Sequence, residues 1–461
     1  MILKQYFLAC LSHASYLIGD EKSGRALVVD PQRDVSAYLE DAAAAGMRIE
    51  RVVETHFHAD FLSGHLELAA RTGAAICYGE PAQADFPITV LRDEECIDLG
   101  GVRVVAWATP GHTPESISLV VYERPDDAEP AAVLTGDTLF IGDVGRPDLL
   151  AAADLSPADM ARSLYHSLHD RLLTLPDATR VYPAHGAGSS CGRSLSTETS
   201  STIGEQRRRN YALAPMSEDA FVAMVTEGQP PAPPYFAFDA VRNRQAHPLL
   251  DEHAELPALD VDSVVTRQSA GAVVLDSRAP NDYAAGHMRG SVNVGLEGRF
   301  AEYAGDVLRP DTPLVLVADE GRAREAMVRL ARVGFDAVIG MLRDPMRAFT
   351  DRPELTERSS RLTAADLAQC LRDGMELTLL DVRNPGETAS GVIDGAVAVP
   401  LAQLAARIGE VDVSRPVVVY CGSGYRSMIA ASLLRRAGAA DVSDLLGGYD
   451  AWRLGRGTHA A

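Results

Sequence analysis

The sequence predicts an α/β protein of several domains, and three observations support this prediction. Its 461 residues are enough for about three domains. In the first half, short apolar runs such as 51–53 and 132–134 alternate with helix-like segments such as 35–45. In the second half, two related stretches of about 100 residues repeat this alternation, which indicates two α/β domains with central parallel sheets.

Composition and charge limit the partners and the compartment. The chain is 46% hydrophobic and 23% charged, which is typical of a globular protein. Its net charge of -21 would repel duplex nucleic acid and anionic membranes, so we expect neither as a partner. No apolar run approaches the roughly 20 residues that span a bilayer, and we expect no signal peptide at the N-terminus. The six cysteines lack Cys-x-x-Cys spacing, which favours a reducing compartment, and we expect a cytoplasmic protein.

A metal site is predicted where the apolar strand at 51–53 ends. His56 and His58 follow it two residues apart, so on extended backbone both imidazoles point to the same side, and Asp60 continues the alternation. Two imidazoles and a carboxylate directed to one point favour a bound metal, although a single His-x-His also occurs on protein surfaces by chance. A helix over 62–72 is expected to follow.

Three further loops place a potential ligand directly after a strand-like run. They carry His112, Asp137 and His185. Four such strand-end loops in this order resemble the metallo-β-lactamase fold over roughly the first half of the chain. The resemblance implies an αββα sandwich over residues 1–241, with the loops gathered around a metal centre.

One position departs from the two-metal pattern of that family. The usual motif is His-x-His-x-Asp-His, and its last position here holds Phe61, whose ring has no lone pair to bind a metal. A second site would keep only Asp60 and His185 beside a bridging Asp137. A stable second metal, and with it a two-zinc hydrolase of the glyoxalase II type, is therefore disfavoured.

The remaining ligands suit one metal held by His56, His112 and Asp137. Two imidazoles and one carboxylate with open positions opposite are typical of non-haem Fe(II) oxygenases. Within this fold, such a site resembles the persulfide dioxygenases, which implies one Fe(II) per chain, with His58 near the iron but not bound to it. A three-histidine zinc site that uses His58 is the alternative, so zinc in place of iron stays open.

Two residues are expected on the substrate side of the metal. In the dioxygenases, a Gly-Arg loop matching 145–146 helps to hold a glutathione-like carboxylate, and the forked guanidinium of Arg146 suits a bidentate contact. The alternative is a surface arginine in a turn. Cys191 follows His185 closely and is expected near the pocket mouth, where it carries sulfur, lines the substrate channel or is an inert small side chain.

The two repeated stretches resemble rhodanese domains over most of their length. We expect them at 260–352 and 360–461, after a linker at 242–259. The resemblance implies that each copy is an α/β domain around a parallel sheet.

The second copy carries a candidate nucleophile. A strand at 417–420 leads into Cys421, and a helix begins near Ser427. A cysteine that opens a helix faces free backbone N–H groups and the positive end of the helix dipole, and with Arg426 nearby these favour the nucleophilic thiolate. The loop residues expected to surround a bound anion or persulfide are Gly422, Ser423, Gly424 and Tyr425.

The first copy lacks this nucleophile. Aligned on Arg324, the cysteine position holds Asp319, within one residue of register, and residues 258–352 contain no cysteine. This copy is expected to be a structural spacer or an interaction module. In the second copy, four residues separate Cys421 from Arg426. Cysteine phosphatases that resemble this fold have a wider loop for phosphate, so the shorter loop suits a sulfur cargo.

Together these parts resemble the multidomain persulfide dioxygenase–sulfurtransferases of bacteria. The resemblance implies that the first domain oxidises a low-molecular-weight thiol persulfide, such as glutathione persulfide, with O2 to sulfite. It also implies that Cys421 moves sulfane sulfur to or from thiosulfate, in the detoxification of sulfide. We expect these small molecules as partners, and a homo-oligomer. The alternative class is a zinc-dependent thioester hydrolase with rhodanese domains as sulfur-carrier modules.

Overall fold

The computed structural model describes residues 1–149, 155–229 and 231–457. Contacts divide the chain into two units, of which the first contains residues 1–232 and 236–250 and the second contains 233–235 and 251–461. The last four residues of the expected range 360–461 lie outside the described residues.

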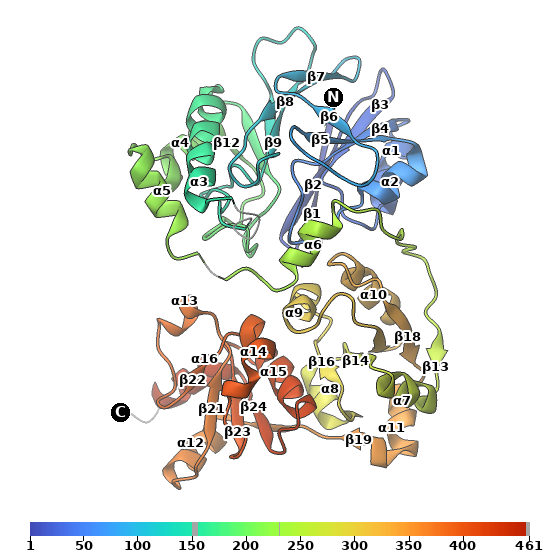
Figure 1. Cartoon of the computed structure of the whole chain (residues 1–461), viewed down its shortest axis with the longest axis vertical. Helices are drawn as coiled ribbons and strands as arrows, with labels where there is room; N and C mark the ends of the chain where they lie inside the picture. The colour runs from blue at the N-terminus through green and yellow to red at the C-terminus, as the bar shows by residue number, and fades with distance from the viewer. Residues whose placement is uncertain (150–154, 230, 458–461) are drawn as a thin grey trace. The chain divides into compact units, whose positions relative to one another are not determined.

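Two six-stranded sheets form the centre of the first unit (Figure 1). The first sheet contains, in spatial order, β1 (Ile2–Leu8), β2 (His13–Asp20), β3 (Arg25–Val29), β4 (Arg48–Val53), β5 (Ala75–Gly79) and β6 (Thr89–Leu91). The second contains β12 (Ser201–Thr202), β11 (Arg180–Pro183), β10 (Ala132–Gly136), β9 (Ile117–Tyr122), β8 (Arg103–Ala108) and β7 (Glu95–Asp98).

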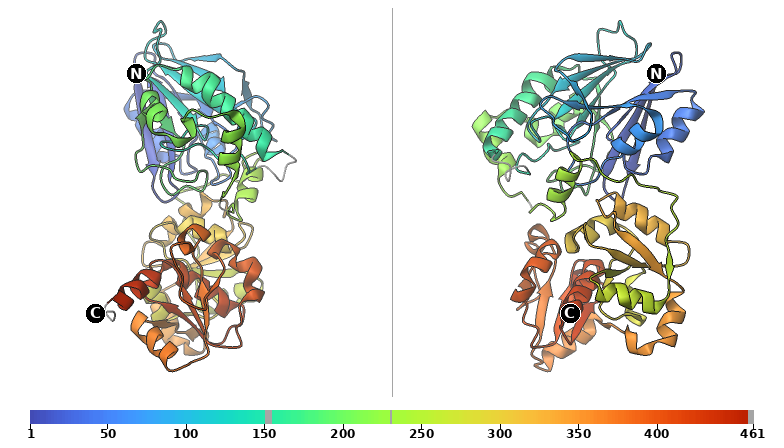
Figure 2. Two further views of the ribbon diagram at one scale, coloured as in Figure 1. Left: turned by 90° about the vertical axis from the view of Figure 1, so that its left-hand side faces the viewer. Right: turned by 45° about the vertical axis from the view of Figure 1, so that its right-hand side comes forward.

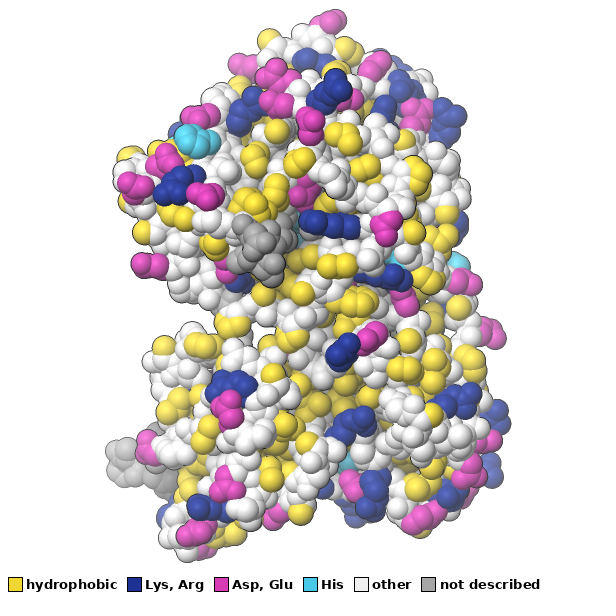
Figure 3. Space-filling view, viewed as in Figure 1, with side chains coloured by type: hydrophobic (Ala, Val, Ile, Leu, Met, Phe, Trp, Pro, Cys, Tyr) yellow, Lys and Arg dark blue, Asp and Glu magenta, His cyan; other side chains and the backbone are white. Residues whose placement is uncertain are grey.

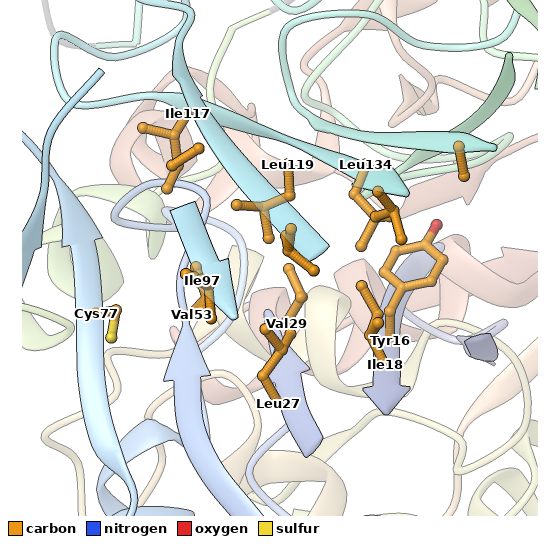
Figure 4. Close-up of a cluster of buried hydrophobic side chains, with 14 of the residues drawn as sticks. Tyr16, Ile18, Leu27, Val29, Val53, Cys77, Ile97, Ile117, Leu119 and Leu134 are labelled. Atoms are coloured by element: carbon orange, nitrogen blue, oxygen red, sulfur yellow. The ribbon is translucent and has the colours of Figure 1, made fainter. Parts of the chain in front are cut away.

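The two sheets pack face to face through a shared apolar core. Leu27 and Val29 of β3 lie in this core, whereas Ala26 and Val28 lie in the cluster on the opposite face of the sheet. This division follows from the strand itself, because successive side chains point to opposite faces. Figure 4 shows side chains of β3 opposite Leu119 of the second sheet.

Helices cover the outer face of each sheet (Figures 1 and 2). On the first sheet lie α1 (Ser36–Ala44) and α2 (His65–Thr72), and on the second lie α3 (Pro157–His166), α4 (Ile203–Arg209) and α5 (Glu218–Thr226). A short helix, α6 (Phe236–Arg242), follows. The four layers confirm the predicted αββα sandwich.

Helix α2 begins at His65, three residues after the start predicted from the sequence. The backbone before it is held by other contacts: Ser63 N–H donates to the side chain of Asn243 (2.9 Å), and Gly64 N–H donates to the carbonyl of Pro31 (2.8 Å). A Cβ on Gly64 would lie 2.3 Å from the carbonyl oxygen of Gln32, so only glycine fits there. Asn243, which lies inside the expected linker, is fully buried by these contacts.

The second unit contains the predicted repeat as two five-stranded parallel sheets with the same strand order. The first sheet is β13 (Ala258–Leu259), β18 (Val338–Leu342), β17 (Leu314–Val317), β14 (Val273–Asp276) and β16 (Val292–Asn293). The second is β20 (Ser360–Leu362), β24 (Val442–Leu445), β23 (Val417–Tyr420), β21 (Thr378–Asp381) and β22 (Val397–Ala398). A two-stranded ribbon pairs β15 (His287–Met288) with β19 (Thr356–Glu357).

Helices flank both parallel sheets. In the first copy they are α7 (Val261–Ser269), α8 (Pro280–Ala285), α9 (Phe300–Val307), α10 (Ala323–Ala331) and α11 (Pro345–Asp351). In the second copy they are α12 (Ala364–Arg372), α13 (Pro385–Thr388), α14 (Leu401–Arg407), α15 (Tyr425–Arg436) and α16 (Gly448–Gly457).

The two copies share a buried contact through α15. Asn293 N–H at the end of β16 donates to the hydroxyl of Ser432 (3.0 Å). Met428, also on α15, is fully buried against Tyr283 and Ala284 of the first copy. The first copy therefore supports the helix that follows the cysteine loop of the second.

On the face shown in Figure 3, acidic and basic side chains are interspersed rather than gathered by sign. Among the described residues, no helix is both long enough and apolar enough to cross a bilayer.

A buried ion pair in the first unit generates a stability prediction. Glu67 on α2 accepts from the guanidinium of Arg33 (2.9 Å) and from the amide of Leu250 (3.0 Å), and both ion-pair partners are at most 3% exposed. Glu67→Ala leaves Arg33 buried without this carboxylate, and we expect it to lower the free energy of unfolding by about 3–5 kcal/mol. Hydrogen exchange of the amides of β4 measures this.

The exposed Arg207–Asp177 pair of the same unit gives a matched control. Asp177→Ala should cost less than about 1 kcal/mol, because water solvates both partners. Equal losses in the two variants would show that burial of the Arg33–Glu67 pair does not set its importance.

Candidate metal centre and cysteine loop

The predicted ligands of the first unit meet at one edge of its two sheets. His56 and His58 follow β4, His112 follows β8, and Asp137 and His185 follow β10 and β11. Because β10 and β11 are parallel neighbours, the residues after their carboxyl ends lie side by side. The strand order thus brings distant parts of the sequence together.

His56, His112 and Asp137 form a buried group whose ligand atoms all lie within 4.8 Å of one another. Asp137 Oδ2 is 3.8 Å from His56 Nε2 and 3.4 Å from His112 Nε2. Ligand atoms about 2.1 Å from a common ion lie roughly 3.0–3.4 Å apart, so only small shifts would close this group around a metal.

Neighbouring groups set which nitrogen of each imidazole faces the metal. Thr55 donates its hydroxyl hydrogen to Asp30 (2.9 Å), so Thr55 Oγ1 accepts from Nδ1–H of His56 (3.0 Å). His112 Nδ1–H donates to the carbonyl of Arg146 (2.9 Å). In both rings Nε2 is left with its lone pair, as a metal ligand requires.

The electrostatics of this group fit a cation. Burial, followed by the neighbouring imidazoles, holds the pKa of His56 well below its usual value, so the ring is neutral. Burial raises the pKa of Asp137 to about 7, which a bound cation would reverse. His56 Nε2 is buried and makes no hydrogen bond with any described residue. The residues therefore fit a divalent metal ion.

The other predicted ligands form a second buried group of His58, Asp60 and His185. His185 Nε2 lies 3.4 Å from Asp60 Oδ2 and 3.5 Å from Asp137 Oδ1. His58 Nε2 lies 3.0 Å from Asp30 Oδ1, a partner outside the metal group. Phe61 is buried with its ring centroid 4.4 Å from that of His58.

His13 belongs to the same cluster and was not identified from the sequence. Its ring centroid lies 4.0 Å from that of Phe61 and 5.7 Å from that of His185. It is the first residue of β2, and it is not part of a recognisable metal-ligand motif. The sequence pattern therefore did not indicate that it lies near the metal site. Only the tertiary pairing of His13 with His185 brings it here.

Arg146 and Cys191 lie next to this centre, and both are buried. The guanidinium of Arg146 makes two hydrogen bonds of 2.7 Å with Asp148, and at 2% exposure Arg146 is not the surface arginine considered as an alternative. Cys191 is 1% exposed, inside the protein rather than at a pocket mouth, with its sulfur near Asp137. Burial and the carboxylates of Asp60 and Asp137 raise the pKa of its thiol well above the usual value, so it stays protonated.

In the second unit, Cys421 stands where β23 ends and is buried. Its sulfur accepts a hydrogen bond from the amide of Gly424 (3.1 Å), and Gly424 has a φ of +104°, a conformation that favours glycine. The loop is also held from α16, because Tyr449 N–H donates to the Cys421 carbonyl (2.7 Å). Of the other predicted loop residues, Gly422 is half-buried and Ser423 is exposed.

The last two residues of this loop have partners of their own. The Tyr425 hydroxyl donates to the carbonyl of Gly295 in the first copy. Arg426, expected beside the sulfur, makes two hydrogen bonds with the carboxylate of Glu387, at 2.7 and 2.6 Å. Glu387 was not identified from the sequence, where it is one acid in a short polar turn.

The sheet register corrects the alignment of the first copy by one residue. Asp276 pairs with Val317, as Asp381 pairs with Tyr420 in the second copy. The counterpart of Cys421 is therefore Ala318 rather than Asp319. An alanine here cannot carry sulfur.

Comparisons with known proteins agree with this architecture. The metallo-beta-lactamase superfamily model matches residues 8–185, and the rhodanese-like domain model matches residues 260–351 and 363–454. A probable metallo-hydrolase of Burkholderia pseudomallei is 33% identical over 260 residues, which cover 49% of this chain and 85% of that protein. Persulfide dioxygenase ETHE1, mitochondrial, of Bos taurus is 30% identical over 251 residues, which cover 53% of this chain and 87% of that protein.

A solved structure extends the similarity beyond the first unit. The crystal structure of a metallo-beta-lactamase from Staphylococcus aureus is 31% identical, with a TM-score of 0.67, and the match covers 75% of this chain and 99% of that one. With the two rhodanese-like matches, this confirms the predicted fold class. The chain therefore belongs to the metallo-beta-lactamase superfamily, with two rhodanese-like domains following the metallo-beta-lactamase domain.

Proposed function

We propose that this protein is a non-haem iron persulfide dioxygenase joined to a sulfurtransferase. The first unit would convert R–S–SH, O2 and H2O into R–SH, sulfite and two protons, with R–SH a low-molecular-weight thiol such as glutathione. The observation that carries the proposal is the buried group of His56, His112 and Asp137, with the buried Phe61 at the last position of the motif His-x-His-x-Asp-His. A role in removing sulfide-derived sulfane sulfur follows from this chemistry.

The donor set suits iron. His56, His112 and Asp137 would hold an Fe(II) ion with two imidazoles and one carboxylate, and such an ion would supply the chemistry for O2 and a sulfur ligand. The chain's own residues fix the geometry: Thr55 and the Arg146 carbonyl orient the two rings. The similarity to a persulfide dioxygenase over 87% of its length supports the proposed dioxygenase activity.

Arg146 and Cys191 are proposed on the substrate side. A substrate carboxylate would compete with Asp148 for the forked guanidinium of Arg146. The protonated thiol of Cys191 would line the space beside Asp137 without itself acting as a nucleophile.

For the second rhodanese-like domain we propose sulfur transfer through Cys421. The Cys421 thiolate attacks the outer sulfur of thiosulfate, the S–S bond breaks, and sulfite leaves with the electron pair. In the reverse step, sulfite attacks the outer sulfur of the Cys421 persulfide and takes it as thiosulfate. The amide of Gly424 supports this role, because it donates to the sulfur that would make the attack.

A second candidate function is a two-zinc thioester hydrolase. The buried group of His58, Asp60 and His185 beside Asp137 favours it, as does the similarity to a probable metallo-hydrolase. Metal analysis of anaerobically purified protein, together with O2 uptake and sulfite formation from glutathione persulfide, separates the two. One iron and O2 uptake support the dioxygenase, whereas two zincs and thioester cleavage support the hydrolase.

Removing one proposed ligand tests the metal site. Loss of a residue that only hydrogen-bonds to a metal ligand typically weakens metal binding by about 10–100-fold. Asp137→Ala removes a proposed ligand itself, so it should weaken iron binding by more than roughly 100-fold, and O2 uptake should be lost as well. Iron per chain after dialysis is the measurement. Asp98→Ala, an exposed carboxylate of the same unit, is the control and should keep its iron. Full iron in the Asp137 variant would contradict the ligand assignment.

Removing the proposed nucleophile tests the independence of the two activities. Cys421→Ser should abolish sulfur transfer from thiosulfate to cyanide, because no other thiol lies on this loop, and leave O2 uptake with glutathione persulfide intact. Cys370→Ser, on α12 of the same domain, is the matched control and should keep both activities. Loss of O2 uptake in the Cys421 variant would mean that Cys421 delivers substrate to the iron.

Replacing Phe61 tests whether it limits the site to one metal. Phe61→His should add an imidazole beside Asp60 and His185, so the variant should bind additional zinc and lose O2 uptake as the second cation competes for Asp137. Calorimetric titration with zinc measures the stoichiometry. Phe57→His is the control, because the Phe57 ring stacks on Tyr78 instead, with centroids 4.3 Å apart. A stoichiometry equal to that of the parent would show that Phe61 is not the switch.

A further inference from the structure

The arginine of the cysteine loop is already occupied by a carboxylate. Arg426 Nη1 lies 2.7 Å from Glu387 Oε2, and Arg426 Nη2 lies 2.6 Å from Glu387 Oε1. The Glu387 side chain is 39% exposed and that of Arg426 is 16% exposed, so the carboxylate is on the solvent side of the pair. A fork-to-fork pair of this kind is geometrically specific and stronger than a single contact.

This ion pair lies over the loop itself. A Cβ placed on Gly422 would be 3.7 Å from both Arg426 Nη2 and Glu387 Oε1. Gly422 is the residue after Cys421, so any molecule that reaches the sulfur over this side of the loop passes the carboxylate. The mouth of the loop therefore carries a negative charge together with its arginine.

Glu387 is held in place from its own helix as well. Its Oε2 accepts from the amide of Asn384 (3.1 Å) in a capping box at the start of α13. Burial raises the pKa of Glu387, but the hydrogen bond and charge of Arg426 outweigh it, and the net pKa lies below the usual value. The carboxylate is thus fixed and ionised at neutral pH.

The cysteine-less copy has an acid and an arginine at the corresponding positions, but they do not pair. Asp282 on α8 corresponds to Glu387, and Arg324 on α10 corresponds to Arg426. Both line a pocket of about 1930 Å³, but they form no ion pair, and Arg324 has no hydrogen-bond or ion-pair partner among the described residues. The aspartate is one methylene shorter and the loop before Arg324 is one residue longer, counted from Ala318. The rhodanese-like fold alone therefore does not impose the contact.

We propose that Glu387 is a specificity-determining residue of the Cys421 loop, which disfavours dianionic sulfur donors and favours less charged persulfides. Thiosulfate carries two negative charges, and its sulfonate oxygens would have to share Arg426 with Glu387. A like charge at hydrogen-bond range of the same cation weakens dianion binding. A persulfide donor carries at most one charge at its sulfur and needs no such contact. This inference rests on the proposed sulfur transfer through Cys421.

The variant Glu387→Gln removes the charge and little else. Glutamine at this helix position retains the capping contact with Asn384 and a hydrogen bond to Arg426. The donors are thiosulfate, a dianion, and methanethiosulfonate, a monoanion, with cyanide as the acceptor. We expect the KM for thiosulfate to fall about tenfold and the KM for methanethiosulfonate by about threefold or less, with kcat within about twofold. Asp282→Asn, the matched change in the cysteine-less copy, should leave all four constants unchanged.

Other outcomes would overturn the proposal. An unchanged KM for thiosulfate, an equal fall for both donors, or a loss of kcat would mean that Glu387 does not select donors by charge. Calorimetric titration of thiosulfate into Cys421→Ser and into Cys421→Ser/Glu387→Gln needs no turnover. Tighter binding in the double variant supports the charge barrier even if the parent transfers no sulfur, whereas equal affinity contradicts it.

Discussion

Desolvation is the constraint on which the metal centre depends. Asp30 and Asp137 are at most 2% exposed, and a carboxylate out of water is costly unless donors or a cation compensate it. Asp30 is compensated by Thr55, which donates from its amide and its hydroxyl. Asp137 instead has imidazole nitrogens at 3.4–3.8 Å, an arrangement that a cation between them stabilises. The strand-end loops thus suit a positive charge, which a bound cation would supply.

The two rhodanese-like copies share a scaffold that tolerates the loss of the nucleophile. In each, an aspartate at the end of a strand pairs with an arginine two residues later: Arg278 with Asp276 and Arg383 with Asp381. Each arginine also donates to a glycine carbonyl eight residues on, which fixes the next turn. Because these contacts stabilise each copy, the fold does not require a cysteine at the position of Cys421. The first copy instead packs on α15, the helix that follows the cysteine loop.

The features that could be predicted from the sequence are those formed by residues close together in the chain. His56 follows a strand and has other potential metal ligands within a few residues, and Cys421 precedes a helix. Both were therefore proposed as site residues from their neighbours in the sequence. His13 and Glu387 could not be identified, because each acts through a partner 172 or 39 positions away, His185 and Arg426. The start of α2 was predicted too early for the same reason: the contact that holds Ser63 comes from Asn243. Distant tertiary contacts, rather than local propensity, decided each of these points.

The second buried group, of His58, Asp60 and His185, lies beside Phe61 and could itself hold a metal. His185 lies 3.4 Å from Asp60, and His58 lies 3.0 Å from Asp30, so each imidazole faces a carboxylate. Neither contact is a hydrogen bond, because Nε2 of both rings is buried without a hydrogen-bond partner among the described residues. In a two-metal centre Asp60 and His185 would bind the second ion, and Asp137 would bridge the two ions. A phenyl ring at position 61 adds no ligand there, which agrees with the proposal that one metal is held by His56, His112 and Asp137.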